Sequence, residues 1–248
     1  MHEAILHNIL ILLERGAFAQ AQEGATLQPM SPHKWRKLAD ISARLHIMRF
    51  VAQGAKEYKD DNALLPVLLD TLEAKKYQEE ETAFDFTSAH LFNHWTQKHL
   101  EDVREGEMNS HNTSDESLML LDIIIKNAEY VITGDTNVEG IITMGRFIRD
   151  NKEKIDYNKI RQWLAHIGLI QIASMEGNML IDCMNFNAQE LPFVVKPFHR
   201  ARKLFLNSII KVYGKHSFSN ATRMNVAMLE TISHRFMKAI SMVTDIEE

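Results

Sequence analysis

Residues 155–184 read IDYNKIRQWLAHIGLIQIASMEGNMLIDCM, and the two halves of this stretch have different hydrophobic patterns. In the first half, apolar side chains recur every three or four residues up to Gly168, which predicts a short helix over 155–167. In the second half, apolar and polar residues alternate on both sides of Glu176-Gly177-Asn178, which is a plausible tight turn. The second half therefore predicts a β-hairpin.

The order of these elements resembles the later part of a winged helix-turn-helix, in which a helix leads through Leu-x-x-x-Gly-Leu-Ile into a hairpin with a polar tip. Here the pattern is Leu164-Ala-His-Ile-Gly168-Leu-Ile, and a predicted helix over 137–151 would be the scaffold before it. A β-hairpin attached to a helical bundle is the alternative interpretation. No Lys or Arg lies between Arg161 and Lys196, although a wing that binds a duplex generally carries at least one. A winged unit here would therefore contact another protein rather than a groove of DNA.

Outside this stretch the helical period dominates, and the 248 residues include only 10 Gly and 5 Pro. Ser31 as N-cap and Pro32 at the first helical position open a predicted helix that runs to residue 52. Further helices are predicted over 3–22, 63–78, 85–106, 114–133, 137–151, 197–213 and 219–243. The predicted fold class is mainly α, with an acidic helical bundle over 1–134. A winged-helix-like unit with one β-hairpin and basic C-terminal helices follows over 135–248.

Charge is divided unevenly along the chain, although the whole chain carries a net charge of −5. Residues 1–140 hold 23 Asp and Glu against 13 Lys and Arg, whereas residues 141–248 hold 10 against 15. Residues 196–238 contain nine Lys and Arg residues but a single acidic residue, Glu230. Such a basic segment is typical of a surface that meets a polyanion or an acidic partner.

Nucleic acid, either DNA or RNA, is the partner that this segment favours most, because phosphate contacts are made mainly by lysine and arginine. The predicted nucleic-acid-binding residues are Lys152, Lys154, Lys159, Arg161, Lys196, Arg200, Arg202, Lys203, Lys211 and Lys215. The leading functional hypothesis is a non-enzymatic regulatory or accessory protein. In the first alternative the chain is an interaction or assembly subunit, whose basic half meets an acidic protein surface or the acidic half of another copy. Two further interpretations stay open: the basic segment pairs with the acidic half of the same molecule, or it lies in solvent without a partner.

Catalytic signatures are weak, and the sequence predicts no catalytic residue, cofactor or resident metal. It contains no phosphate-binding loop, dinucleotide fingerprint or nucleophile elbow. His90 and His94 would lie one turn apart on the predicted helix over 85–106, with Glu101 on nearly the same face, as in a transition-metal site. A metal-dependent hydrolase is therefore one further alternative. Cys183 has apolar neighbours and is expected to be a buried small side chain.

Arg161-Gln-Trp-Leu-Ala-His166 has the Arg-x4-His spacing and resembles the motif of HEPN-type ribonucleases. The resemblance covers two residues and implies that arginine and histidine act together on a phosphodiester of RNA. However, two residues five positions apart on a helix point about 140° away from each other. A solvent-facing arginine and a histidine that satisfies last-turn carbonyls are the simpler interpretation.

Segments that would direct the chain to a membrane are not evident. The apolar run Ile5–Leu13 is interrupted by His7 and Asn8 and ends at Glu14, so it is too short to span a bilayer. Since Cys183 is the only cysteine, no internal disulfide requires an oxidising compartment. The sequence therefore predicts a cytoplasmic protein without a membrane partner.

Overall fold

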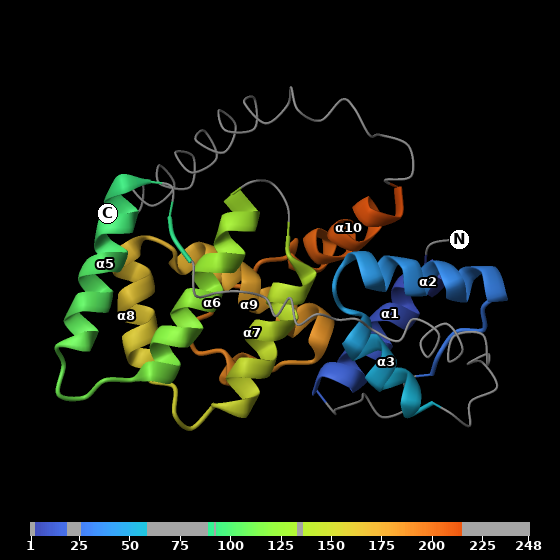
Figure 1. The fold of residues 1–248 in the computed structure, drawn as a ribbon, viewed down its shortest axis with the longest axis horizontal. Helices are drawn as coiled ribbons and strands as arrows, with labels where there is room; N and C mark the ends of the chain where they lie inside the picture. The colour runs from blue at the N-terminus through green and yellow to red at the C-terminus, as the bar shows by residue number, and fades with distance from the viewer. Residues whose placement is uncertain (1–2, 19–25, 59–88, 92, 133–135, 215–248) are drawn as a thin grey trace.

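The computed structural model describes residues 3–18, 26–58, 89–91, 93–132 and 136–214. Throughout these ranges the regular structure is helical, with no strand (Figure 1). The helices are α1 (Glu3–Phe18), α2 (Pro32–Arg44), α3 (Met48–Lys56), α5 (His94–Met108), α6 (Asp115–Ile132), α7 (Val138–Asp150), α8 (Tyr157–Ile167), α9 (Ile170–Met184), the 3-10 helix η1 (Ala188–Glu190) and α10 (Ala201–Gly214). The prediction of a mainly α protein is confirmed.

The predicted β-hairpin is wrong, and with it the winged-helix-like unit, because residues 170–184 form the single helix α9. Gly177 is an interior position of this helix rather than a turn. The real breaks are Gly168 and Asn185, whose φ angles of 84° and 54° lie in the left-handed region and end α8 and α9 respectively. The alternation that suggested strands arises because α9 is buried on most of its circumference.

The helices predicted over 114–133, 137–151 and 155–167 agree with the structure apart from their ends, whereas the one predicted over 85–106 begins only at His94. Asp156 caps α8 by accepting hydrogen bonds from the backbone N–H groups of residues 158 and 159. The helix predicted to run from residue 32 to residue 52 is instead two helices, α2 and α3, separated at His46, which has a φ of 56°. The helix predicted over 197–213 begins only at Ala201. The helices predicted over 63–78 and 219–243 lie outside the described residues.

The core lies where α6, α7 and α9 meet and continues toward α1. Helix α6 packs against α7, α8 and α9, while α1 packs against α2, α3, α7 and α9. Helix α5 rests on α8 at one end of the long axis, and α10 rests on α9 and α2 toward the other end (Figure 1). The predicted domain boundary at 134/135 lies outside the described residues and stays a prediction.

The α1–α3 crossing brings two backbones into direct contact. A Cβ added at Gly16 would lie 1.8 Å from the carbonyl oxygen of Phe50, and one at Gly54 would lie 2.1 Å from that of Leu12. Glycine is therefore required on both helices at this crossing. Among the described residues, no helix combines the length and the apolar character that crossing a membrane requires.

Candidate nucleic-acid interface

The loop that leads into α10 is fastened to α9 by buried polar side chains. Ser174 Oγ accepts a hydrogen bond from the backbone N–H of Val195 at 2.8 Å. One turn later, Asn178 Nδ2 donates to the carbonyl of Lys196 at 2.9 Å and to the carbonyl of Ser174 at 2.7 Å. Both side chains are buried, so these bonds hold the backbone of the loop in one position.

A third contact lies on the same stripe of α9. Arg202 donates from its guanidinium to the backbone carbonyl of Asp182 at 2.6 Å, and residues 174, 178 and 182 are spaced by four along the helix. Between them, a Cβ on Gly177 would lie 2.4 Å from a methyl group of Val194. The absence of a side chain at Gly177 lets the loop pack directly onto α9.

The anchored loop and the first turn of α10 carry a group of cations. Lys196, Arg200, Arg202 and Lys203 are exposed, whereas Ala201 and Phe205 are buried and attach α10 to the core. Within the part of the chain that the structure describes, no carboxylate pairs with Lys196, Arg200 or Lys203. We call Lys196, Arg200 and Lys203 the loop cations. Of the other predicted contacts, Lys211 is exposed on α10 and Lys215 lies outside the described residues.

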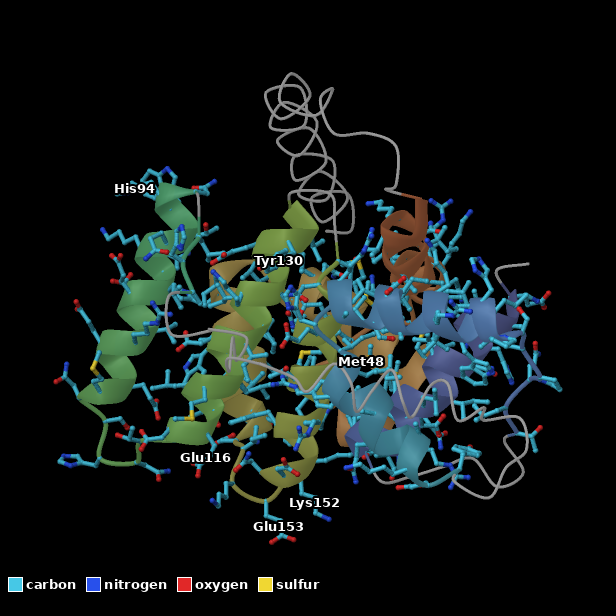
Figure 2. The ribbon with its side chains drawn as sticks, turned by 45° about the vertical axis from the view of Figure 1, so that its right-hand side comes forward. Met48, His94, Glu116, Tyr130, Lys152 and Glu153 are labelled. Carbon is cyan, nitrogen blue, oxygen red and sulfur yellow. The ribbon has the colours of Figure 1, made fainter. Side chains whose placement is uncertain are left out.

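The predicted contacts over 152–161 have a different environment. Lys154 pairs with Glu116 at 3.3 Å, and Lys159 bonds both Glu107 and the carbonyl of Asn112. Lys152 and Arg161 are exposed. Lys152 lies at the bottom of the molecule, whereas α10 runs near its top (Figure 2). The structure therefore does not bring this segment together with the loop cations.

His90 and His94, on which the alternative of a metal-dependent hydrolase rested, are not on neighbouring turns of one helix. Helix α5 begins at His94, and His90 lies in the preceding segment, where its backbone N–H donates to Glu129 at 3.0 Å. Throughout the described ranges, no group of three His, Cys, Asp or Glu side chains could hold a metal ion. The helical spacing that motivated the metal hypothesis is thus absent.

Arg161 and His166, the Arg-x4-His pair, lie on different faces of α8. His166 stacks on His99 of α5 with ring centroids 4.5 Å apart, and its carbonyl lies 3.1 Å from His99 Nδ1. Arg161 is exposed on α8, about 140° around the helix from His166. His166 therefore serves the contact between α5 and α8.

Cys183 is buried on α9, as predicted. Burial raises the pKa of its thiol to about 12, and the neighbouring Arg202 opposes this only in part. A thiol with such a pKa stays protonated at neutral pH, which argues against a nucleophilic role.

Sequence reasoning missed the three α9 positions that hold the loop and α10, Ser174 and Asn178 through their side chains and Asp182 through its backbone carbonyl. Ser174, Asn178 and Asp182 follow each other at intervals of four, and this polar stripe is visible in the sequence. In the predicted hairpin these residues would fall on two strands and the turn between them, so the stripe is recognised only once residues 170–184 are known to form one helix.

Comparisons with protein-family models, with curated proteins and with solved structures find no match to this chain.

Proposed function

We propose that this protein is a non-enzymatic regulatory or accessory protein that contacts the backbone of a nucleic acid through the loop cations. The observation that carries the proposal is that Lys196, Arg200 and Lys203 are exposed, close in sequence and unpaired with any described carboxylate, on the loop fixed to α9 and the first turn of α10. Cations around the N-terminus of a helix are unfavourable there until an anion neutralises them. A phosphate backbone supplies that anion.

The physical basis of such binding is the release of counterions from the nucleic acid. Each lysine or arginine that neutralises a phosphate releases a condensed cation, so that the affinity falls steeply as salt is added. Contacts from lysine and arginine to phosphate oxygens position a protein on a nucleic acid but carry no sequence information. We therefore expect contact with the backbone of DNA or RNA, independent of base sequence.

Replacing Lys196 and Lys203 with glutamate tests the proposal. We expect the Lys196→Glu/Lys203→Glu variant to bind a labelled duplex about tenfold more weakly at about 50 mM salt, because two phosphate contacts are lost. The slope of log affinity against log salt should become shallower by about 2 for the same reason. Fluorescence anisotropy at about 50 and 200 mM salt measures both quantities, and retention on heparin gives an independent check.

The matched control is Lys152→Glu/Arg161→Glu, which changes the net charge by the same amount at exposed positions. This variant should keep wild-type affinity. Equal losses in both variants would show that the loop cations have no special role and that the segment over 152–161 contributes as first predicted. A wild-type protein that binds no duplex at about 50 mM salt contradicts the proposal itself.

The exposed surface of α5 favours a second candidate, a head-to-tail assembly subunit. This helix exposes Glu101, Asp102 and Glu105 together with two large apolar side chains, Trp95 and Met108, which are 70% and 68% exposed. It lies at one end of the long axis, whereas α10 lies between the middle and the other end (Figure 1). Separate acidic and basic surfaces on one molecule suit association between successive copies.

Light scattering against salt concentration tests this second role. If acidic α5 meets the loop cations of the next copy, the apparent mass should be large at low ionic strength and fall to that of one chain as salt screens the contact. The Lys196→Glu/Lys203→Glu variant should be monomeric throughout. A monomer at every salt concentration excludes the assembly role.

A further inference from the structure

The backbone that carries the first of the loop cations is held on both sides. The N–H of Val195 donates to Ser174 Oγ at 2.8 Å, and the carbonyl of Lys196 accepts from Asn178 Nδ2 at 2.9 Å. Pro197 follows directly, and its ring restricts the backbone further. The position of Lys196 is therefore set by two buried side chains of α9 and not by the loop alone.

Apolar contacts of the same loop add to this attachment. Phe193 is fully buried, and its carbonyl accepts a hydrogen bond from Ser174 Oγ at 3.5 Å. A methyl group of Val194 occupies the space that a Cβ on Gly177 would need. A loop that is already held in this way has little conformational freedom left to lose when it binds a partner.

Arg202 belongs to the same basic segment as the loop cations but uses its guanidinium differently. It donates to the backbone carbonyl of Asp182 at 2.6 Å. Asp182 lies in the last turn of α9, where carbonyls have no partner within the helix and where a positive charge is favourable. Arg202 therefore fastens the first turn of α10 to the end of α9.

We infer that Ser174, Asn178 and Arg202 are positioning residues for nucleic-acid binding, which hold the loop cations in the arrangement that meets the phosphates but do not contact phosphates themselves. This inference rests on the proposed function and adds to it which side chains position and which bind. Loss of one binding cation lowers the slope of log affinity against log salt by about 1. Loss of a positioning contact lowers the affinity and leaves this slope unchanged, because the number of neutralised phosphates stays the same.

The first test compares two neighbouring cations. Arg202→Gln and Lys203→Gln are matched, because each removes one positive charge from an exposed position. We expect Lys203→Gln to bind a labelled duplex with a slope shallower by about 1. Arg202→Gln should bind about fivefold more weakly at about 50 mM salt with the wild-type slope, because the loosened segment must be ordered on binding. A slope that is shallower by about 1 in Arg202→Gln would mean that Arg202 contacts a phosphate, and its positioning role would be wrong.

The second test removes a positioning contact without changing any charge. Ser174→Ala should make amide hydrogen exchange at Val195, measured by nuclear magnetic resonance, faster than in wild type. It should also weaken duplex binding about fivefold with an unchanged slope, and Asn178→Ala should weaken binding in the same way. Ser208→Ala is the matched control for Ser174→Ala, because it removes a buried hydroxyl that donates to the carbonyl of Leu204 within α10. This control should match wild type in affinity and in exchange at Val195.

The outcomes separate this inference from the proposed function. If exchange at Val195 is faster in Ser174→Ala but the affinity is that of wild type, while Lys196→Glu/Lys203→Glu is defective, the positioning role is wrong and the proposed function stands. Unchanged exchange at Val195 in Ser174→Ala overturns the attachment itself, and an equal loss of affinity in Ser208→Ala overturns its specific role. If wild-type protein binds no duplex, the inference and the proposed function both fail.

Discussion

Replacing Gly54 with alanine is expected to lower the free energy of unfolding by about 3 kcal/mol, although alanine is the better helix former. The new Cβ would lie 2.1 Å from the carbonyl oxygen of Leu12 and 3.1 Å from the backbone nitrogen of Gly16. Backbone atoms cannot move aside as the end of a flexible side chain can, so α1 and α3 must separate. Separation exposes apolar surface that this crossing buries.

Denaturant unfolding of the wild type and the variant measures the loss. Gly16→Ala should cost at least as much, because its Cβ would lie 1.8 Å from the carbonyl oxygen of Phe50. Gly106→Ala is the matched control, since nothing lies within 4 Å of the Cβ that it adds to α5. That variant should be more stable than wild type by up to about 1 kcal/mol. Equal stability of all three variants would mean that the α1–α3 backbones are not in contact.

The helical class of this protein follows from its sequence, but the conformation of residues 170–184 does not follow from periodicity alone. Polar residues of α9 such as Glu176 and Asn178 are buried together with its apolar ones, so no solvent-facing stripe marks the helical period. A buried segment gives similar patterns as a helix and as a strand. Two short strands and a turn fill the same 15 residues, so length does not separate the helix from the hairpin either.

The break between α2 and α3 could not be predicted from local signals. His46 adopts a φ of 56° without a glycine or proline nearby, and a non-glycine residue in this region is uncommon. The break places Met48, Phe50 and Val51 in the core on a second helix. Tertiary packing, rather than local sequence, sets the path of the chain at this point.

The candidate interface was predictable in part. The charge pattern identified Lys196, Arg200 and Lys203, and all three are exposed. It gave equal weight to Lys159, which bonds Glu107, a residue 52 positions away in the sequence. A single sequence does not reveal such distant pairs.

Glu176→Gln is expected to remove a pH dependence that a buried carboxyl imposes on the stability of the protein. Glu176 lies on α9 with no exposed surface, and neither of its oxygens reaches hydrogen-bond geometry with any described residue. Burial raises the pKa of this carboxyl well above its ordinary value of 4.5, and the side chain of Asn127 on α6 opposes the shift only in part. The native state therefore holds a proton that the unfolded chain releases.

The sign of the effect follows from this difference in bound protons. Above pH 4.5 the unfolded state binds fewer protons at this site than the native state, so the free energy of unfolding falls as pH rises. The fall is at most about 1.4 kcal/mol per pH unit from this one group, and it ends once pH exceeds the raised pKa in the native protein. Below pH 4.5 both states are protonated and the contribution is constant.

Urea unfolding between pH 4 and pH 8 tests this expectation. Glu176→Gln should resemble the wild type at about pH 4 and exceed its unfolding free energy by more than about 1 kcal/mol at about pH 8, because a neutral amide loses no proton. Glu105→Gln makes the same chemical change at an exposed position of α5 and should leave the pH profile unchanged. The opposite result is a difference in unfolding free energy between Glu176→Gln and wild type that stays constant across this range. It would mean that the pKa of Glu176 is not raised in the native state. Glu176 must then have a partner that stabilises its charge in the folded protein.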